Sequence, residues 1–408
     1  MSPSSKNAAG RVPGVAASGP GLGLAAACLS LFAYATALFI TPASNNEIAR
    51  TFGASLGLLG RLPLALMVGF LVGVAVSGRL ADRQGKLPLM GVGNLCTTAG
   101  VMGFAMAQDF QMTLLANFVV GLGGGLSETA SLALVSDLYA AARRTSMANL
   151  SQAMFSAGAV LSPLAVGVLL AAGVDWRWGY VGVAVPGVLA AVLSLIAAVR
   201  RVDRTSIAPV SRDSQTRAVP ASPILTPTLG LLSLGAALYV GAEIGQSTWL
   251  SVLLERELEA APAPAAAGLS LLWLGLALGR LAAIWVARRL TDLAILRGSL
   301  LLATAFEAAL LLSPEPVFAL AASFGLGVCF GPVFPTIVSA ATSARPDRSG
   351  LVMSIVVAAG AIGGAIFPAW IGVLADLVGL RPALLMCLAL LGVNAAMFLG
   401  ARLGPRPR

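Results

Sequence analysis

Residues 78–86 read Gly-Arg-Leu-Ala-Asp-Arg-Gln-Gly-Lys and join two long apolar stretches, residues 60–78 and 87–106. Each stretch is close to the roughly 20 residues that a helix needs to cross the hydrocarbon core of a bilayer. The joining segment carries four charged side chains, which are too costly to place in that core. The pattern indicates two transmembrane helices joined by a short charged loop, and the same alternation continues along the chain.

The composition makes lipid the expected solvent of this protein. Of the 408 residues, 58% are hydrophobic and only 11% are charged, and the mean hydropathy is +0.89. Soluble domains usually carry about 25% charged residues. This deficit excludes most soluble enzymes, and the sequence offers no phosphate-binding loop and no soluble catalytic domain. We therefore predict that the protein is not an enzyme.

The sequence predicts no cofactor and no metal site. Histidine is absent, which removes the commonest metal ligand. The four cysteines lie far apart inside apolar runs, without a C-x-x-C pair, and we interpret them as small buried side chains. They are Cys28, Cys96, Cys329 and Cys387.

Twelve apolar runs are long enough to span a membrane, which predicts an all-α membrane protein with twelve transmembrane helices. The predicted spans are residues 23–41, 60–78, 87–106, 112–138, 151–172, 179–199, 228–253, 265–287, 293–312, 317–341, 351–375 and 382–401.

The positive charges predict the orientation. Twenty of the 26 Lys and Arg residues fall in the two tails and in every second connection, four fall in the alternate connections, and Arg61 and Arg280 fall inside spans. Positively charged loops stay in the cytoplasm. We therefore expect both termini to be cytoplasmic, in the inner (plasma) membrane of a bacterial-type cell. The net charge of +9 is then a topology signal, and no nucleic-acid partner is expected.

The longest polar interior segment divides the spans six and six. It is rich in Arg, Asp, Ser and Pro and is typical of a flexible linker. We predict a tail at residues 1–22, a first six-helix bundle at 23–199, a linker at 200–224, a second bundle at 225–402 and a tail at 403–408.

The two predicted bundles resemble each other in sequence. Residues 69–71 and 79–82 are echoed by 279–281 and 289–292, a displacement of 210 positions. In the fifth and eleventh spans the displacement is 205 and matches Gly158, Pro163 and Gly167 with Gly363, Pro368 and Gly372. Chance matching in an Ala/Gly/Leu-rich chain is the alternative. A duplication of six spans explains both regions and predicts two pseudo-symmetric bundles with a binding site between them near the midplane.

The charged loop also carries a family resemblance. Gly78 can let another helix approach closely, Gly85 suits a tight turn, and Asp82 can meet an arginine or a helix N-terminus. The run resembles the signature G-x-x-x-D-R-x-G-R-K of the major facilitator superfamily, with Lys86 at the first basic position after the glycine and Leu87 at the second. The likeness extends over the whole chain in span count, linker and repeat.

The resemblance implies a latch that ties the cytoplasmic ends of the two halves together in the outward-open state. Gly78 would pack on the eleventh span, and Asp82 would face the start of that span near Gly350. Arg83 would pair with the acid at the cytoplasmic end of the fourth span, which is Asp137 here.

Three shorter matches resemble the fucose permease-like branch of that family. They are residues 126–130 in the fourth span, 239–243 followed by Trp249 in the seventh, and 331–336 in the tenth. The fucose permease has an acid within the first span, whereas this chain has Tyr34 and Thr36 there as its main polar groups. The sugar and a two-acid proton scheme therefore do not carry over directly.

Glu128 is the leading candidate for proton coupling. On a helix, Asn117, Gly121, Gly124 and Glu128 share one face, which gives a small-residue, polar stripe with an acid at its end. An ionisable residue inside a membrane is costly and is often part of a proton or solute pathway. A purely structural ion pair or hydrogen bond is the alternative.

Other deep polar residues offer two interpretations each. One face of the seventh span carries Tyr239, Glu243 and Gln246. These side chains could line a solute path or hold neighbouring helices together through hydrogen bonds. Trp249 could stack on a solute ring or anchor the span at the membrane interface. Arg280 could neutralise an acid or hold an anion. For Glu307, a packing or ion-pair role is expected.

These patterns predict a secondary transporter that moves a small polar solute, with a sugar as a candidate, by alternating access with proton coupling. We expect the solute, protons and the lipid bilayer as its partners, and no oligomer is required. Efflux of amphipathic drugs is the alternative within the family. A channel or a non-transporting receptor is the alternative of another class.

Overall fold

The computed structural model describes residues 19–200, 202, 226–345 and 348–401. All regular structure in these residues is helical, and twelve segments are long and apolar enough to cross a membrane, which confirms the predicted fold class. The linker and the two tails lie almost wholly outside the described residues, so the domain boundaries stay a prediction. The helices are α1 (Gly19–Phe52), α2 (Leu56–Leu59), α3 (Arg61–Gln84), α4 (Lys86–Ala105), α5 (Phe110–Leu138), α6 (Ala141–Ala171), α7 (Arg177–Val199), α8 (Pro227–Arg256), α9 (Pro262–Val286), α10 (Asp292–Leu311), α11 (Pro316–Phe330), α12 (Val333–Ala344), α13 (Ser349–Val378) and α14 (Leu380–Gly400).

The first span differs most from its predicted bounds. Helix α1 runs from Gly19 to Phe52, whereas the apolar run ends at residue 41. The added part is polar and includes Asn45 and Asn46, which hydrogen bond to α8. Hydropathy places the end of a span where the apolar run ends, but tertiary partners keep this polar segment helical.

The tenth predicted span consists of two helices. Helix α11 ends at Phe330 and α12 begins at Val333, because Pro332 has no N–H with which to continue the hydrogen-bond ladder. At the break, Gly331 lies directly against the α9 backbone at Gly279 and Arg280. At the end of α11, the carbonyl oxygen of Phe330 accepts a hydrogen bond from the Tyr239 hydroxyl at 3.0 Å.

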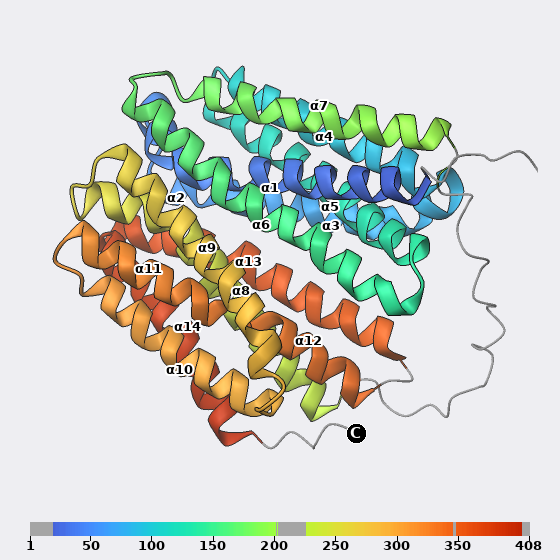
Figure 1. The fold of residues 1–408 in the computed structure, drawn as a ribbon. Helices are drawn as coiled ribbons and strands as arrows, with labels where there is room; N and C mark the ends of the chain where they lie inside the picture. The colour runs from blue at the N-terminus through green and yellow to red at the C-terminus, as the bar shows by residue number, and fades with distance from the viewer. Residues whose placement is uncertain (1–18, 201, 203–225, 346–347, 402–408) are drawn as a thin grey trace, which may run out of the picture.

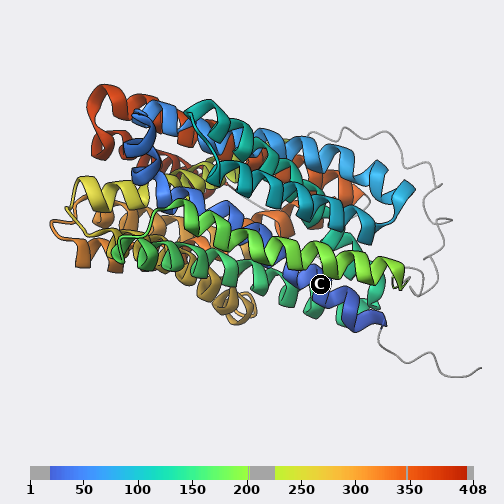
Figure 2. The ribbon, with the colours of Figure 1, turned by 90° about the horizontal axis from the view of Figure 1, so that it is seen from above.

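The helices form two bundles, α1–α7 and α8–α14, which lie one above the other in Figure 1 and run along a common direction in both views (Figures 1 and 2). The bundles repeat the same internal contacts. Gly158 of α6 lies against Phe32 and Thr36 of α1, and Gly363 of α13 lies against Ala237 of α8. Both partners of the first contact, residues 158 and 32, are displaced by 205 positions in the second.

Contacts between the bundles gather at one end of the molecule, which we call the closed end and which lies at the left of Figure 1. It carries the turns at residues 53–55, 106–109, 172–176, 257–261, 312–315 and 379. There Gly60 meets Ala369, and Gly167 meets Ala263 and Ala266. Residues 167 and 372 are repeat partners, and Gly372 likewise contacts the other bundle, at Leu56. The small residues let helices of different bundles touch through their backbones.

Candidate functional site

Close backbone contacts fix the helix that carries Glu128. Gly121 and Gly125 of α5 lie against the α3 backbone at Leu66 and Phe70, and Gly123 lies against Thr97 of α4. A side chain at any of these glycines would overlap the neighbouring helix, so α5 is held from two sides. In the predicted small-residue stripe, Gly121 and Gly124 therefore make contacts with neighbouring helices.

Tyr34 packs inside the first bundle beside this helix. Its ring covers Gly124 and stacks on Phe70, with centroids 6.0 Å apart and planes 6° apart. Only 3% of Tyr34 is exposed. The Tyr34 hydroxyl and the Glu128 carboxylate interact electrostatically. Tyr34 therefore belongs to the surroundings of Glu128 and has little surface left for a solute.

Glu128 is half-buried and meets a charge from the other bundle. The positive charge of Arg280 on α9 interacts with the Glu128 carboxylate on α5. Arg280 is positioned by the break between α11 and α12, because its backbone lies against Gly331. Its buried Nε atom has no hydrogen-bond partner among the described residues. The guanidinium thus retains a free donor beside an acid from the opposite bundle.

Arg280 also interacts with a second acid, Glu243 of α8. Glu243 is 7% exposed, and its carboxylate also interacts with the side chain of Tyr239, whose hydroxyl donates to the Phe330 carbonyl oxygen. Two acids and one base, contributed by both bundles, therefore share one electrostatic cluster, which we call the central charge cluster: Glu128, Glu243 and Arg280. The sequence identified all three residues, but it did not show that Arg280 serves both acids.

Gln246 and Glu307 are wholly buried, and their polar atoms have no hydrogen-bond partner among the described residues. No ion pair with Glu307 is present among the residues that the structure describes, although one was a predicted role for this side chain. Glu307 interacts electrostatically with the Cys387 thiol on α14. That sulfur lies 3.8 Å from the Ala242 carbonyl oxygen of α8, so Glu307 faces the interior of the second bundle.

Trp249 has a structural role that sequence reasoning missed. The side chain is fully buried, its Nε1 donates to the Pro368 carbonyl oxygen of α13 at 3.0 Å, and its ring covers Gly372. In this structure the ring packs against α13 and is fully buried, so neither expected role, a solute-stacking ring or an interface anchor, is seen here, and both stay predictions. The Trp249–Pro368 bond instead ties two helices of the second bundle.

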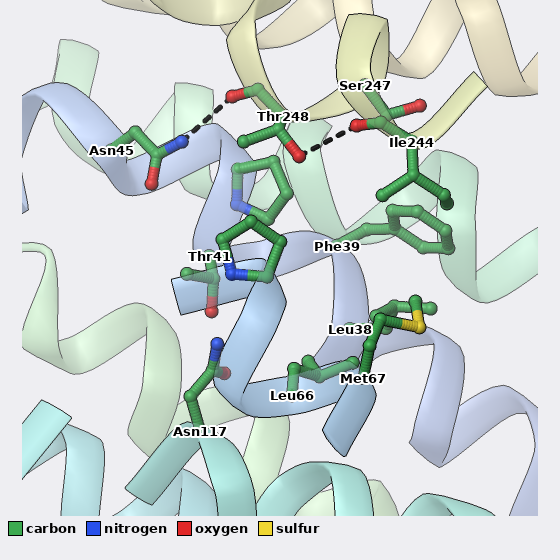
Figure 3. A pocket seen from close by; sticks show the side chains of 12 residues that line it. Leu38, Phe39, Thr41, Asn45, Leu66, Met67, Asn117, Ile244, Ser247 and Thr248 are labelled. Carbon is green, nitrogen blue, oxygen red and sulfur yellow. Dashed lines mark hydrogen bonds between the residues drawn. The ribbon is translucent and has the colours of Figure 1, made fainter. Parts of the chain in front are cut away.

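A small cavity lies between the bundles nearer the closed end (Figure 3). Its volume is about 30 Å³. Asn117 lines this cavity and donates from Nδ2 to the Leu62 carbonyl oxygen at 2.8 Å. Asn117 precedes Glu128 by eleven residues, which corresponds to roughly 16 Å along a helix. The structure therefore separates Asn117 from the central charge cluster, although the two residues share a helix face in the sequence.

A polar network joins α1 and α8 at the closed end. Asn45 Nδ2 donates to the Thr248 carbonyl oxygen at 2.8 Å, and Asn46 Nδ2 donates to the Glu255 carboxylate at 2.8 Å. Arg256 Nε donates to the Asn46 side-chain oxygen at 2.8 Å, and Arg50 pairs with Glu255. Sequence reasoning missed this network. The adjacent asparagines at the end of an apolar run were its only signal.

A second link crosses the closed end between α13 and α2. The Asp376 carboxylate accepts hydrogen bonds from the Ser55 hydroxyl at 2.7 Å and from the Gly57 N–H at 2.9 Å. The short helix α2 is therefore capped by an acid of the other bundle, which satisfies an N–H that has no partner within the helix.

The charged loop of residues 78–86 does not form the implied latch in this structure. Gly85 has φ +90° and ends α3 in a tight turn, as predicted. Asp137 pairs with Lys86 in this structure, and the pairing with Arg83 that the resemblance implies for the outward-open state stays a prediction. Asp82 and Arg83 are exposed, and a Cβ added to Gly78 would meet no atom within 4 Å. The surroundings of Gly350 are not among those that the structure describes, so the expected contact between Asp82 and the start of α13 stays a prediction.

Comparison with known proteins decides the family. Residues 24–368 match the family model of the Major Facilitator Superfamily. The chain belongs to this superfamily. The family and the fold are those of membrane transporters, which are not enzymes. With twelve membrane-spanning helices and bacterial relatives, this major facilitator is a multi-pass protein of the bacterial inner membrane.

Two curated relatives from Bacillus subtilis (strain 168) match shorter stretches of this major facilitator. A putative metabolite transport protein, YwtG, is 30% identical over 130 residues, which cover 32% of this chain and 28% of YwtG. An arabinose-proton symporter is 25% identical over 115 residues, or 28% of this chain and 25% of the symporter. Each match therefore spans less than a third of the relative.

The solved structures match the whole fold. A bacterial homolog of the human lysosomal transporter Spinster, in an inward-facing and occupied conformation, superimposes with a TM-score of 0.77. The match covers 94% of this chain and 97% of the other at 18% sequence identity. At this identity the likeness concerns the fold alone.

Proposed function

We propose that this major facilitator is a secondary active transporter that moves a small, uncharged polar solute such as a sugar, together with protons, by alternating access. The central charge cluster carries the proposal. Glu128 comes from one bundle and Arg280 and Glu243 come from the other, so a proton on either acid changes the attraction between the two bundles. The arabinose-proton symporter among the relatives supports a sugar and a proton as cargo.

The arrangement of the bundles supports an inward-facing state. If the positively charged connections and both termini are cytoplasmic, the closed end faces the outside of the cell. The interbundle hydrogen bonds of Asn45, Asn46 and Asp376 then seal the external side. The exposed residues Asp82 and Arg83 lie at the cytoplasmic end, where the implied latch is disengaged.

Arg280 is placed to couple proton binding to bundle movement. With both acids ionised, its guanidinium is attracted to Glu128 across the interface and to Glu243 within its own bundle. Protonation of Glu128 removes the attraction across the interface and leaves the pair inside the second bundle. A solute hydroxyl can then take the free Nε donor of Arg280. In this scheme Glu128 is the proton carrier and Arg280 the shared counter-ion.

Proton coupling is tested in proteoliposomes by external pH during uptake of L-fucose, L-arabinose or D-xylose. We expect the external medium to become alkaline as a transported sugar enters. Glu128→Gln should abolish this change and any accumulation driven by a proton gradient, while counterflow of the same sugar persists. Glu257→Gln, an exposed acid in the turn after α8, is the matched control and should behave as the unaltered protein. Sugar uptake without any pH response would reject the proton part.

Efflux of amphipathic compounds is the second candidate, because an aromatic contact lies between the bundles. Phe39 of α1 and Trp273 of α9 have ring centroids 4.1 Å apart, and Phe155 packs edge-on against Phe39 at 6.1 Å. Aromatic surface of this kind suits a flat apolar solute. Energised efflux of ethidium from cells that express the protein, with no uptake of the three sugars, would favour this function.

A further inference from the structure

The cavity between the bundles has unused hydrogen-bonding atoms. Asn45 of α1, Asn117 of α5 and Ser247 of α8 line it, and each is at most 2% exposed. The side-chain oxygens of Asn45 and Asn117 and the Ser247 hydroxyl have no hydrogen-bond partner among the described residues. Figure 3 shows these three side chains around one space, with residues of both bundles facing each other across it.

These atoms need partners that the protein does not supply. A buried acceptor without a hydrogen bond is costly, and native structures leave few of them. The amide nitrogens of the two asparagines are already engaged with the Thr248 and Leu62 carbonyl oxygens, which fixes the orientation of both side chains. The unpaired oxygens are therefore held in place by the fold, and the polar side of the cavity is preorganised.

Pro42 adds a backbone acceptor to the same space. It lies inside α1 and lines the cavity together with Leu38. Since proline has no N–H, the carbonyl of Leu38, four residues earlier, lacks its helical donor. The helix thus has a carbonyl without its helical donor at a residue that lines the cavity.

The residues that line the cavity also indicate the charge of the group that it can bind. None of the residues that line the cavity is ionisable, and the two further hydroxyls in the lining are engaged, since Thr41 accepts from Tyr180 and Thr248 donates to the Ile244 carbonyl oxygen. The remaining walls are apolar, formed by residues such as Phe39 and Met67. A cation there would lack a compensating charge, which makes its burial costly. Acceptors set in apolar walls suit an uncharged group that donates hydrogen bonds and has a carbon skeleton, as a sugar hydroxyl does.

We propose that this cavity is an outer solute subsite that accepts hydroxyl groups of an uncharged polyol or sugar. This subsite proposal rests on the proposed transport function, and it adds a binding site that is distinct from the central charge cluster. In the closed arrangement the volume of about 30 Å³ has room for a water molecule but not for a sugar. Separation of the bundles at the closed end widens the space and exposes the oxygens of Asn45, Asn117 and Ser247 to an entering solute.

Ser247→Ala tests the subsite with little risk to folding, because the hydroxyl that it removes has no partner. The matched control is Ser251→Ala, one turn further along α8, whose hydroxyl is equally buried and unpaired but does not line the cavity. Binding of L-arabinose, D-xylose and L-fucose is measured for both variants and for the unaltered protein. Because Ser247→Ala loses one neutral hydrogen bond to the sugar, we expect its dissociation constant to be about tenfold larger than that of the unaltered protein. For Ser251→Ala we expect a change of less than twofold.

Deoxy analogues of whichever sugar binds separate a direct contact from an indirect effect. The analogue that lacks the contacted hydroxyl should bind Ser247→Ala and the unaltered protein equally, so the two losses are not additive. Equal affinities of Ser247→Ala and Ser251→Ala for the parent sugar would overturn the subsite and leave the transport function standing. If the unaltered protein neither binds nor transports any of the three sugars, the sugar assignment and the subsite both fail.

Discussion

The two halves of this protein make the same backbone contacts but carry different chemistry. Gly158 and Gly363, 205 positions apart, each let α6 or α13 touch the first helix of its own bundle. One turn along, the first half has a hydrogen bond from the Ser162 hydroxyl to the Thr36 carbonyl oxygen at 2.8 Å. At the equivalent positions the second half has Phe367 packed on Gly241. The repeat thus preserves how closely the helices approach, while the side chains that fill the contact have diverged.

The interior charges show the larger difference. The spans of the first half contribute Glu128, whereas those of the second contribute Glu243, Arg280 and Glu307. Among the described residues, Arg280 is the base that interacts with Glu128, and it belongs to the second half, so Glu128 is neutralised from across the interface. The difference indicates that bundle movement and charge state are linked at Arg280, and the following predictions test this asymmetry.

Replacing Arg280 should have the largest effect. We expect Arg280→Gln to lower sugar uptake at least 100-fold, because Glu128 and Glu243 then both lose their counter-ion and remain uncompensated. The double variant Arg280→Gln/Glu128→Gln should regain thermal stability without regaining uptake. A melting temperature for Arg280→Gln equal to that of the unaltered protein would contradict the shared counter-ion.

Replacing the glycines at the repeated contacts should have the second largest effect, a loss of stability in variants of either half. Gly158→Ala and Gly363→Ala place a methyl group against the backbone of α1 or α8, which should cost about 1–3 kcal/mol of stability. Gly182→Ala and Gly298→Ala are matched controls, since a Cβ at either position would meet no atom within 4 Å. Thermal unfolding in detergent measures all four. If only one half responds, the repeat does not preserve these contacts energetically.

Loss of the Trp249 hydrogen bond should have a smaller effect, confined to the second half. Trp249→Phe leaves the Pro368 carbonyl oxygen without its donor and should destabilise the protein by about 1 kcal/mol. Sugar affinity should not change, because the ring is fully buried against α13. A weaker affinity at unchanged stability would restore the interpretation of Trp249 as a solute contact.

The smallest effect is expected at Gly78, which has no close neighbour in this structure. Gly78→Ala should leave stability within about 1 kcal/mol, because nothing surrounds the added methyl group and alanine favours helix. If Gly78 packs on α13 in the outward-open state, as the family resemblance implies, the variant should favour the present state. Spin labels at Gln84 and Leu351, both exposed, should then report a larger share of long distances. An unchanged distribution would place Gly78 outside the latch.

Sequence patterns predicted the residues of the central charge cluster better than their partners. Glu128, Glu243 and Arg280 stood out because charges are rare in apolar spans. Helix face and proximity in sequence group Asn117 and Trp249 with these residues. A shared face, however, does not determine how deep in the membrane a side chain lies or which helix it contacts. Asn45, Ser247 and Asp376 were missed, because their roles depend on residues about 200 or more positions away in the other bundle.

The sequence by itself determined that this chain needs lipid around it, that its twelve spans are helical, and that its charged side chains inside the membrane need partners or water. These follow from local quantities: the cost of exposing apolar surface to water, and of leaving backbone or charge unsatisfied in hydrocarbon. Only the tertiary structure decided that Arg280 serves both acids, that Lys86 rather than Arg83 meets Asp137, and that unpaired oxygens surround one cavity. Such choices depend on which side chains of distant helices are brought within hydrogen-bonding reach, and no periodicity along a single chain encodes that distance.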